Sequence, residues 1–191
     1  GIHLKDRYED TDVKGLIFMS NEKTPLFILA TGGTIEKIYD EFEGNLQNRD
    51  TIVKNKILER LRLPWTEISV KQIMSKDSLF MDDNDREFIL QSIIAHERGK
   101  NPIVVLHGTD TMDLTSKYCH DKHPDVSVPV VFTGAMKPLG FDDSDAAQNV
   151  IEAIFAARIL KPGYYVTFHG KLFTVPNFKK NKTKGTFEEI T

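Results

Sequence analysis

Residues 26 to 34, Leu-Phe-Ile-Leu-Ala-Thr-Gly-Gly-Thr, join a short apolar run directly to a loop with two glycines and two threonines. A continuous apolar run of this length is typical of a strand that is buried on both faces, as in a parallel sheet. Glycines allow a tight turn and the close approach of other backbone. The segment therefore predicts a first core strand, at residues 26 to 30, that ends in a polar loop.

The same pattern of strand and polar loop recurs along the chain and alternates with segments of helical periodicity. Further strands are predicted at residues 68 to 73, 103 to 106, 128 to 134, 164 to 168 and 172 to 175. Helices are predicted at residues 51 to 61, 84 to 97, 112 to 120 and 146 to 160. The last two strands are joined by His169-Gly170-Lys171, which suggests a hairpin.

Alternating strands and helices with fully apolar strands indicate an α/β fold. We expect a single doubly wound domain with a mainly parallel sheet and helices on both faces. The domain is expected to span residues 19 to 191. Residues 1 to 18 have no clear periodicity, and we interpret them as a leader that is non-native or disordered.

Composition narrows the class of protein. The chain has 191 residues, 28% of them charged, and a formal net charge of -3, as in an ordinary soluble globular protein. No run of lysine and arginine interleaved with aromatic residues favours nucleic-acid binding, and no apolar stretch approaches the roughly 20 residues of a membrane span. The single cysteine, Cys119, excludes an internal disulfide and fits a reducing compartment. We therefore expect a cytoplasmic protein without nucleic-acid or membrane partners.

Three polar segments follow predicted strands, at the edge where open parallel sheets bind ligands. Thr31-Gly32-Gly33-Thr34 offers hydroxyls that can attack when activated, although a structural turn explains it equally well. His107-Gly108-Thr109-Asp110-Thr111 places a hydroxyl beside a carboxylate, which suits an acid-base role or a helix N-cap. Ser75-Lys76-Asp77-Ser78 can hold a polar ligand, but its composition alone favours a turn.

Two further groups resemble metal sites only superficially. Asp142, Asp143 and Asp145 precede a strong helix, where carboxylates are expected to cap amides and meet the positive end of the helix dipole. His120 and His123 lack further ligands at zinc spacing, so a solvated loop is favoured. We expect neither a metal ion nor an organic cofactor.

Taken in order, residues 31 to 35, 75 to 77, 107 to 112 and 133 to 138 resemble the amino-terminal domain of the L-asparaginases. The resemblance runs from about Leu26 to the end of the chain. It includes Lys179-Lys180-Asn181, which is similar to the segment that supplies the family's catalytic lysine, and Lys180 aligns better than Lys179. Because family members carry a second, carboxyl-terminal domain, the chain resembles a single-domain short form that lacks it.

The resemblance implies hydrolysis of the side-chain amide of L-asparagine to L-aspartate and ammonia. Thr34 would be the nucleophile and form an acyl-enzyme, supported by a triad of Thr109, Asp110 and Lys180. A threonine hydroxyl is a weak nucleophile that needs a nearby base, and a lysine can serve. A carboxylate beside an ammonium favours its charged form, so Asp110 is expected to act mainly by positioning Lys180 and the ammonium group of the substrate.

The resemblance also assigns binding residues. Ser75 and Asp77 would hold the ends of the substrate, and backbone donors around Gly108 to Thr109 and Ala135 would stabilise the oxyanion. Tyr39 is a hypothesis for the tyrosine partner of the nucleophile, although it lies closer to Thr34 in sequence than the family's loop tyrosine lies to its nucleophile. The second-domain glutamate that supports this tyrosine in the family has no matching position here.

Two other functions stay open. The chain could be a non-catalytic amino-acid-binding module, or an amidase subunit that supplies ammonia to a larger amidotransferase. In each case the ligand is a small molecule. A missing domain would leave apolar surface for a second copy to cover, so we expect a homodimer or a higher homo-oligomer.

Overall fold

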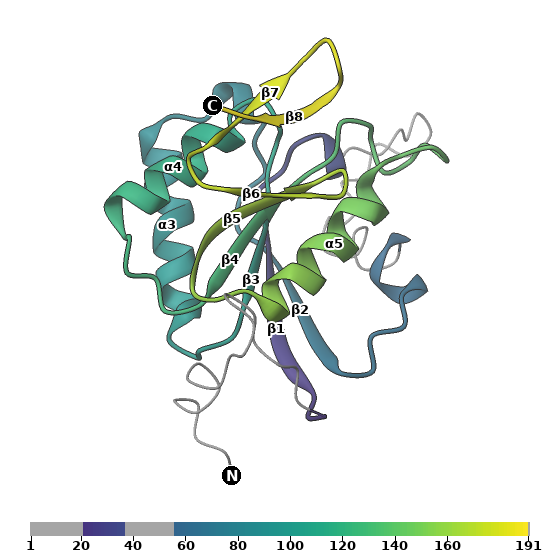
Figure 1. Cartoon of the computed structure of the whole chain (residues 1–191), viewed down its shortest axis with the longest axis vertical. Helices are drawn as coiled ribbons and strands as arrows, with labels where there is room; N and C mark the ends of the chain where they lie inside the picture. The colour runs from purple at the N-terminus through teal and green to yellow at the C-terminus, as the bar shows by residue number, and fades with distance from the viewer. Residues whose placement is uncertain (1–20, 37–55, 191) are drawn as a thin grey trace.

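A computed structural model describes residues 21 to 36 and 56 to 190, which form a six-stranded sheet and a separate two-stranded sheet (Figure 1). The order in the large sheet is β2-β1-β3-β4-β5-β6, and every neighbouring pair is parallel except β5 with β6. Its strands are β1 (Thr24–Ala30), β2 (Thr66–Gln72), β3 (Ile103–Leu106), β4 (Pro129–Thr133), β5 (Gly163–Phe168) and β6 (Lys171–Thr174). The predicted α/β fold with a mainly parallel sheet is confirmed.

Within the described residues, three helices cover the sheet from both sides, and coverage of both faces was predicted (Figure 1). Helices α3 (Asp83–Glu97) and α4 (Met112–Lys122) lie on one face, and α5 (Ala146–Ile159) lies on the other. Helix α3 begins at a reciprocal capping box, in which Asp82 and Asp85 each accept a hydrogen bond from the backbone amide of the other. Helix α5 ends at Ile159, shortly before Pro162, which cannot continue a helix.

The all-apolar strands follow from burial on both faces of the sheet. In β3, Ile103 and Val105 pack into the core beneath α3 and α4, while Val104 and Leu106 pack into the core beneath α5. Alternate side chains of a strand point to opposite faces, so both sets must be apolar when both faces are covered. All four side chains are fully buried.

The end of the chain departs from the prediction. The hairpin of β5 and β6 was expected, but β7 (Phe178–Asn181) and β8 (Thr186–Glu189) form a second antiparallel pair that was not. Only one side chain of each of these strands is fully buried, Phe178 and Phe187, so neither strand has an apolar run. The two rings pack edge to face with centroids 5.4 Å apart and join the core beneath α3 and α4.

Two predicted segments lie wholly or partly outside the described residues. The leader at residues 1 to 18 is one of them. Residues 51 to 55 of the predicted helix are the other, and within the remainder of that helix Leu58–Arg60 is a short 3-10 turn, η2. None of the helices in the described part of the chain has both the length and the apolarity to cross a membrane.

Candidate active site

The order of the strands creates a topological switch point at one edge of the large sheet. Strand β2 lies on one side of β1 and β3 on the other, so the connections that leave β1 and β3 diverge. Ligands of open α/β sheets bind outside the carboxyl ends of the strands at such a point. The loops at residues 31 to 34 and 107 to 111 follow β1 and β3 at this point, at the strand ends where the sequence placed them.

The loop after β1 is held tightly by its backbone. Thr31 donates from Oγ1 to the carbonyl of Leu106, 2.7 Å away, and from its amide to the same carbonyl at 3.1 Å. Gly33 has a φ of +94°, and a Cβ there would lie 2.7 Å from the Cα of Gly108. Only glycine fits this approach, so the two loops touch backbone to backbone. Thr34 follows at once, half-buried, as the first residue of the 3-10 turn η1 (Thr34–Glu36).

Lys180 joins two side chains of the loop after β3. From β7, its Nζ donates to Thr109 Oγ1 and to Asp110 Oδ1, each at 2.8 Å. The side chains of Lys180 and Asp110 are 20% and 28% exposed, so the ion pair is partly shielded from water but still reachable. The hydroxyl of Thr109 accepts from the ammonium and keeps its own proton for another acceptor. This arrangement can pass a proton or orient a water molecule.

His107 is a structural residue in this setting. Its side chain is fully buried, and its Nδ1 donates to the carbonyl of Gly108 at 2.7 Å. Burial lowers the pKa of His107 to about 4, so the imidazole is neutral. Gly134 packs against the same residue, since a Cβ there would lie 2.3 Å from the His107 carbonyl oxygen. Ala135, predicted to contribute to the oxyanion site, follows directly and is buried.

The segment at residues 75 to 78 lies beside the loop after β1. The Lys76 amide donates to the carbonyl of Thr31 at 3.0 Å. Asp77 accepts from the Leu79 amide and caps the 3-10 turn η3 (Ser78–Phe80), so the turn interpretation also describes this segment. Ser75 is exposed next to them. The structure thus places Ser75 and Asp77 beside the loop after β1, whereas Tyr39 lies outside the described residues.

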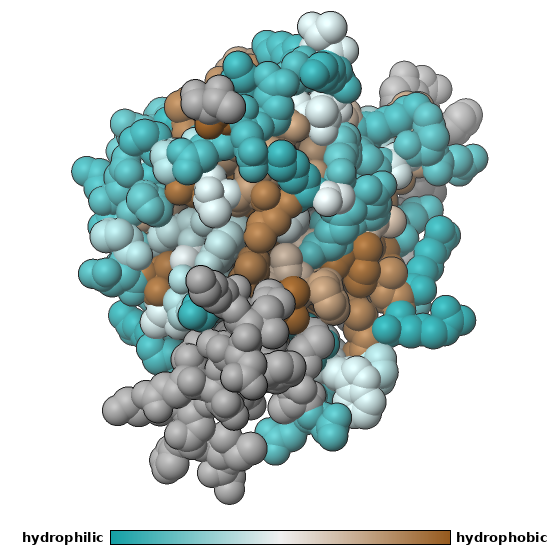
Figure 2. Space-filling model, in the orientation of Figure 1, coloured by the Kyte–Doolittle hydropathy of each residue, from teal (hydrophilic) through white to brown (hydrophobic). Residues whose placement is uncertain are grey.

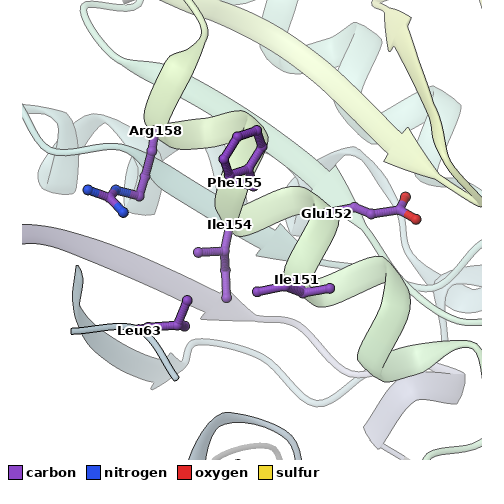
Figure 3. Close-up of a pocket in the computed structure, with 6 residues that line it drawn as sticks. All are labelled: Leu63, Ile151, Glu152, Ile154, Phe155 and Arg158. Atoms are coloured by element: carbon purple, nitrogen blue, oxygen red, sulfur yellow. The ribbon is translucent and has the colours of Figure 1, made fainter. Parts of the chain in front are cut away.

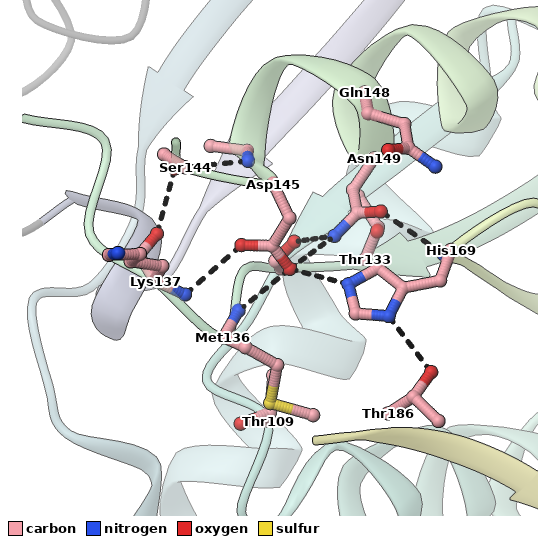
Figure 4. Close-up of polar contacts among 12 residues, drawn as sticks. Thr109, Thr133, Met136, Lys137, Ser144, Asp145, Gln148, Asn149, His169 and Thr186 are labelled. Carbon is pink, nitrogen blue, oxygen red and sulfur yellow. Dashed lines mark hydrogen bonds and ion pairs between the residues drawn. The ribbon is translucent and has the colours of Figure 1, made fainter. Parts of the chain in front are cut away.

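A partly buried polar network that the sequence did not indicate lies next to this site (Figure 4). The carboxylate of Asp145 accepts from the backbone amides of Met136 and Lys137, both at 3.0 Å, and from His169 Nε2 at 2.6 Å. The prediction that Asp145 caps the following helix is therefore wrong, and Ser144 Oγ accepts from the first helical amide instead. Burial raises the pKa of Asp145, but the hydrogen bonds from Met136 and His169 outweigh it and hold the pKa below its usual value.

The same network reaches the hairpin that carries Lys180. The Nδ1 of His169 lies 2.9 Å from Thr186 Oγ1 on β8, the partner strand of β7 (Figure 4). Asn149 of α5 accepts from the amide of His169 and donates to the carbonyl of Gly134. The network around the Asp145 carboxylate thus connects helix α5, the loop after β4 and the hairpin of β7 and β8.

Among residues 21 to 36 and 56 to 190, no group of three or more His, Cys, Asp and Glu side chains is placed to hold a metal ion. His123, one of the two histidines with zinc-like spacing, pairs with Glu97, whose Oε1 lies 2.6 Å from its Nε2. Glu97 also accepts from the amide and hydroxyl of Ser127. His123 is therefore one member of a local structural network.

Comparison with known proteins identifies the family. A family model described as the amino-terminal domain of asparaginase matches residues 25 to 190. The chain belongs to the asparaginase family. The L-asparaginase of Thermococcus kodakarensis is 31% identical to it over 149 residues, which are 77% of this chain and 44% of that protein. The solved structure of the thermostable L-asparaginase from the same organism has a TM-score of 0.79 at 29% identity and covers 87% of this chain.

Two other relatives of this asparaginase-family chain differ in how they are described. A glutamyl-tRNA(Gln) amidotransferase subunit of Methanococcus vannielii is 38% identical over 76 residues, which are 40% of this chain and 18% of that protein. A solved structure described as a "probable cytoplasmic L-asparaginase" of Campylobacter jejuni has a TM-score of 0.72 at 25% identity and covers 87% of this chain. The chain spans less than half of the Thermococcus sequence and about half of each solved structure.

Proposed function

We propose that this chain hydrolyses the side-chain amide of L-asparagine to L-aspartate and ammonia, with Thr34 as the nucleophile. The observation that carries the proposal is the pair of hydrogen bonds from Lys180 to Thr109 and Asp110, which join residues about 70 positions apart. The contact between Gly33 and Gly108 supports it, since the Thr34 loop then lies against the loop that binds Lys180. Membership in the asparaginase family supports the class of reaction.

In the proposed reaction Lys180 acts as a neutral amine. The Thr34 oxygen bonds to the amide carbon, and its proton passes through the Thr109 hydroxyl to Lys180 Nζ, which becomes the ammonium. Backbone donors near Gly108 and Ala135 would stabilise the oxyanion, worth roughly 3 kcal/mol for each well-placed donor. Collapse of the intermediate breaks the carbon–nitrogen bond, and ammonia leaves with the proton. Water then attacks the Thr34 ester, releases aspartate and returns a proton to the hydroxyl.

Asp110 has two tasks in this proposal. It holds the Lys180 ammonium by an ion pair and supplies negative charge for the ammonium group of the substrate. Ser75 and Asp77 would bind the other polar groups of the amino acid, and Tyr39 would assist Thr34. No metal or organic cofactor takes part in these steps.

The decisive assay is ammonia release from L-asparagine. Thr34→Ala is expected to abolish turnover while its circular dichroism matches that of the wild type, and Thr34→Ser is expected to retain part of the activity. Lys180→Met keeps the side-chain stem and is expected to slow turnover by about 100-fold or more. Lys179 is the matched control, because it lies next to Lys180 on β7 but is exposed and pairs with Glu188. Equal effects of Lys179→Met and Lys180→Met would reject the assignment.

A second candidate is an amidase subunit that supplies ammonia to a larger enzyme. The similarity to the Methanococcus amidotransferase subunit favours it, although it covers only 40% of this chain. Faster hydrolysis of L-glutamine than of L-asparagine, together with copurification of a larger partner, would select this function. Calorimetric binding of aspartate without any ammonia release would instead select a non-catalytic binding module.

We further propose that residues 19 to 191 act as one domain, in the cytoplasm and as a homodimer or higher homo-oligomer. The cytoplasmic description of the Campylobacter structure supports the location. Fractionation of the native cells, followed by detection of the chain, would test it.

A further inference from the structure

A groove of about 300 Å³ runs along the outer face of α5 (Figure 3). Its lining is mostly apolar and includes Leu63, Ile151 and Ile154. Phe155 also lines the groove and is 56% exposed. Apolar surface also gathers on the side of the molecule where α5 lies (Figure 2). An exposed aromatic ring next to an apolar groove is typical of a protein–protein contact.

The groove ends in two opposite charges. Glu152 lies at one end and Arg158 at the other, on either side of Phe155 (Figure 3). Within residues 21 to 36 and 56 to 190, Arg158 forms no ion pair, and its buried Nε has no hydrogen-bond partner. Leaving a buried donor of a charged group unpaired is costly. The buried Nε is not accessible from outside, so a partner's carboxylate would pair with the terminal nitrogens of the Arg158 guanidinium.

Glu152 is held in the geometry that such an ion pair needs. Its carboxylate accepts from the amide of Gly170 at 2.8 Å and from the side chain of Gln148 at 2.9 Å. Each carboxylate oxygen still has a lone pair for a guanidinium. The acidic end of the groove is thus fixed by the fold and remains able to bind a cation.

We propose that this groove binds α5 of a second copy of the chain, with the two helices antiparallel about a two-fold axis at Phe155. In that arrangement each residue of α5 faces a residue of the partner's α5. The two residues lie the same number of positions from Phe155, one before it and one after it in the sequence. Glu152 of one copy then faces Arg158 of the other, twice by symmetry, and Ile151 faces Ile159. A two-fold interface requires a self-complementary surface, and the charges and apolar residues of α5 meet that requirement.

This inference specifies the self-association included in the proposed function, and it does not depend on catalysis. Sedimentation equilibrium on the full chain measures it over a concentration series. The wild type is expected to be a dimer, and Phe155→Glu a monomer. Phe88→Glu is the matched control, because Phe88 is 52% exposed on α3, at the opposite face of the sheet. This control is expected to leave the dimer intact.

A charge exchange tests the geometry. Glu152→Arg and Arg158→Glu each place like charges opposite one another, and each is expected to raise the dimer dissociation constant by about tenfold or more. The double variant restores both ion pairs and should recover most of the wild-type affinity. A monomeric wild type at about 100 µM, a dimeric Phe155→Glu, a dissociating Phe88→Glu, or a double variant no tighter than the single ones would each overturn the proposal. Because the readout is mass and not ammonia release, its failure is distinct from failure of the proposed reaction.

Discussion

Replacement of His107 by asparagine should remove a pH dependence of stability that the wild type shows on mild acidification. His107 is fully buried, and burial lowers its pKa from 6.5 to about 4. The unfolded chain therefore binds a proton more readily than the folded chain. The contribution of His107 to the free energy of unfolding is therefore fully present above pH 6.5 and is lost as the pH falls toward 4.

The size of the effect follows from the shift in pKa. Each unit corresponds to about 1.4 kcal/mol, so complete protonation of His107 would lower the unfolding free energy by about 3 kcal/mol. Between roughly pH 7 and pH 5 the expected loss is about 2 kcal/mol. Asparagine can donate to the Gly108 carbonyl as the imidazole does, but it does not titrate.

Urea unfolding followed by circular dichroism at a series of pH values measures both chains. Asp145 and Glu97 have lowered pKa values and also destabilise the fold in acid, but they do so equally in the wild type and the variant. The difference between the two unfolding free energies therefore isolates His107. If that difference is the same at pH 7 and pH 5, the imidazole is not the buried, neutral group described here.

Other predictions follow from packing and burial. Gly33→Ala, which would place a Cβ 2.7 Å from the Gly108 Cα, should lower the unfolding free energy by about 2 kcal/mol or more, measured by urea unfolding. Gly185→Ala also has a positive φ but open space, and a cost as large as that of Gly33→Ala would contradict the steric argument. Burial raises the pKa of Cys119 to about 12, so a thiol reagent at pH 8 should label only unfolded protein, and rapid labelling of the native chain would refute this. Asp145→Asn leaves several donors without a charged acceptor and should cost about 3 kcal/mol, with thermal melting as the measure.

The strands were the most predictable part of the fold, because a strand that is buried on both faces consists of consecutive apolar residues. Strand β3 is buried on both faces, so its four apolar residues identify it without knowledge of any partner. Strand β7 buries Phe178 alone, and its polar residues resemble an ordinary loop. The second sheet depends on contacts with the core that no local pattern shows.

The site was predictable to a similarly uneven degree. The loops after β1 and β3 follow apolar strands, and their shared edge follows from a parallel sheet. Lys180 was found through resemblance to a family, because its bonds to Thr109 and Asp110 span some 70 positions. Asp145 was misinterpreted because a carboxylate before a helix fits a cap equally well. Its actual partners, including His169, are set by tertiary packing.

The close approach of Gly33 to Gly108 fixes the spacing between the loop after β1 and the loop after β3. No side chain lies between the two backbones at that point, so no change of rotamer can widen or narrow the gap. A ligand that needed more room would have to separate β1 from β3, which are neighbours in the parallel sheet. The spacing of these two loops is thus set by the spacing of the strands and not by the conformation of any side chain.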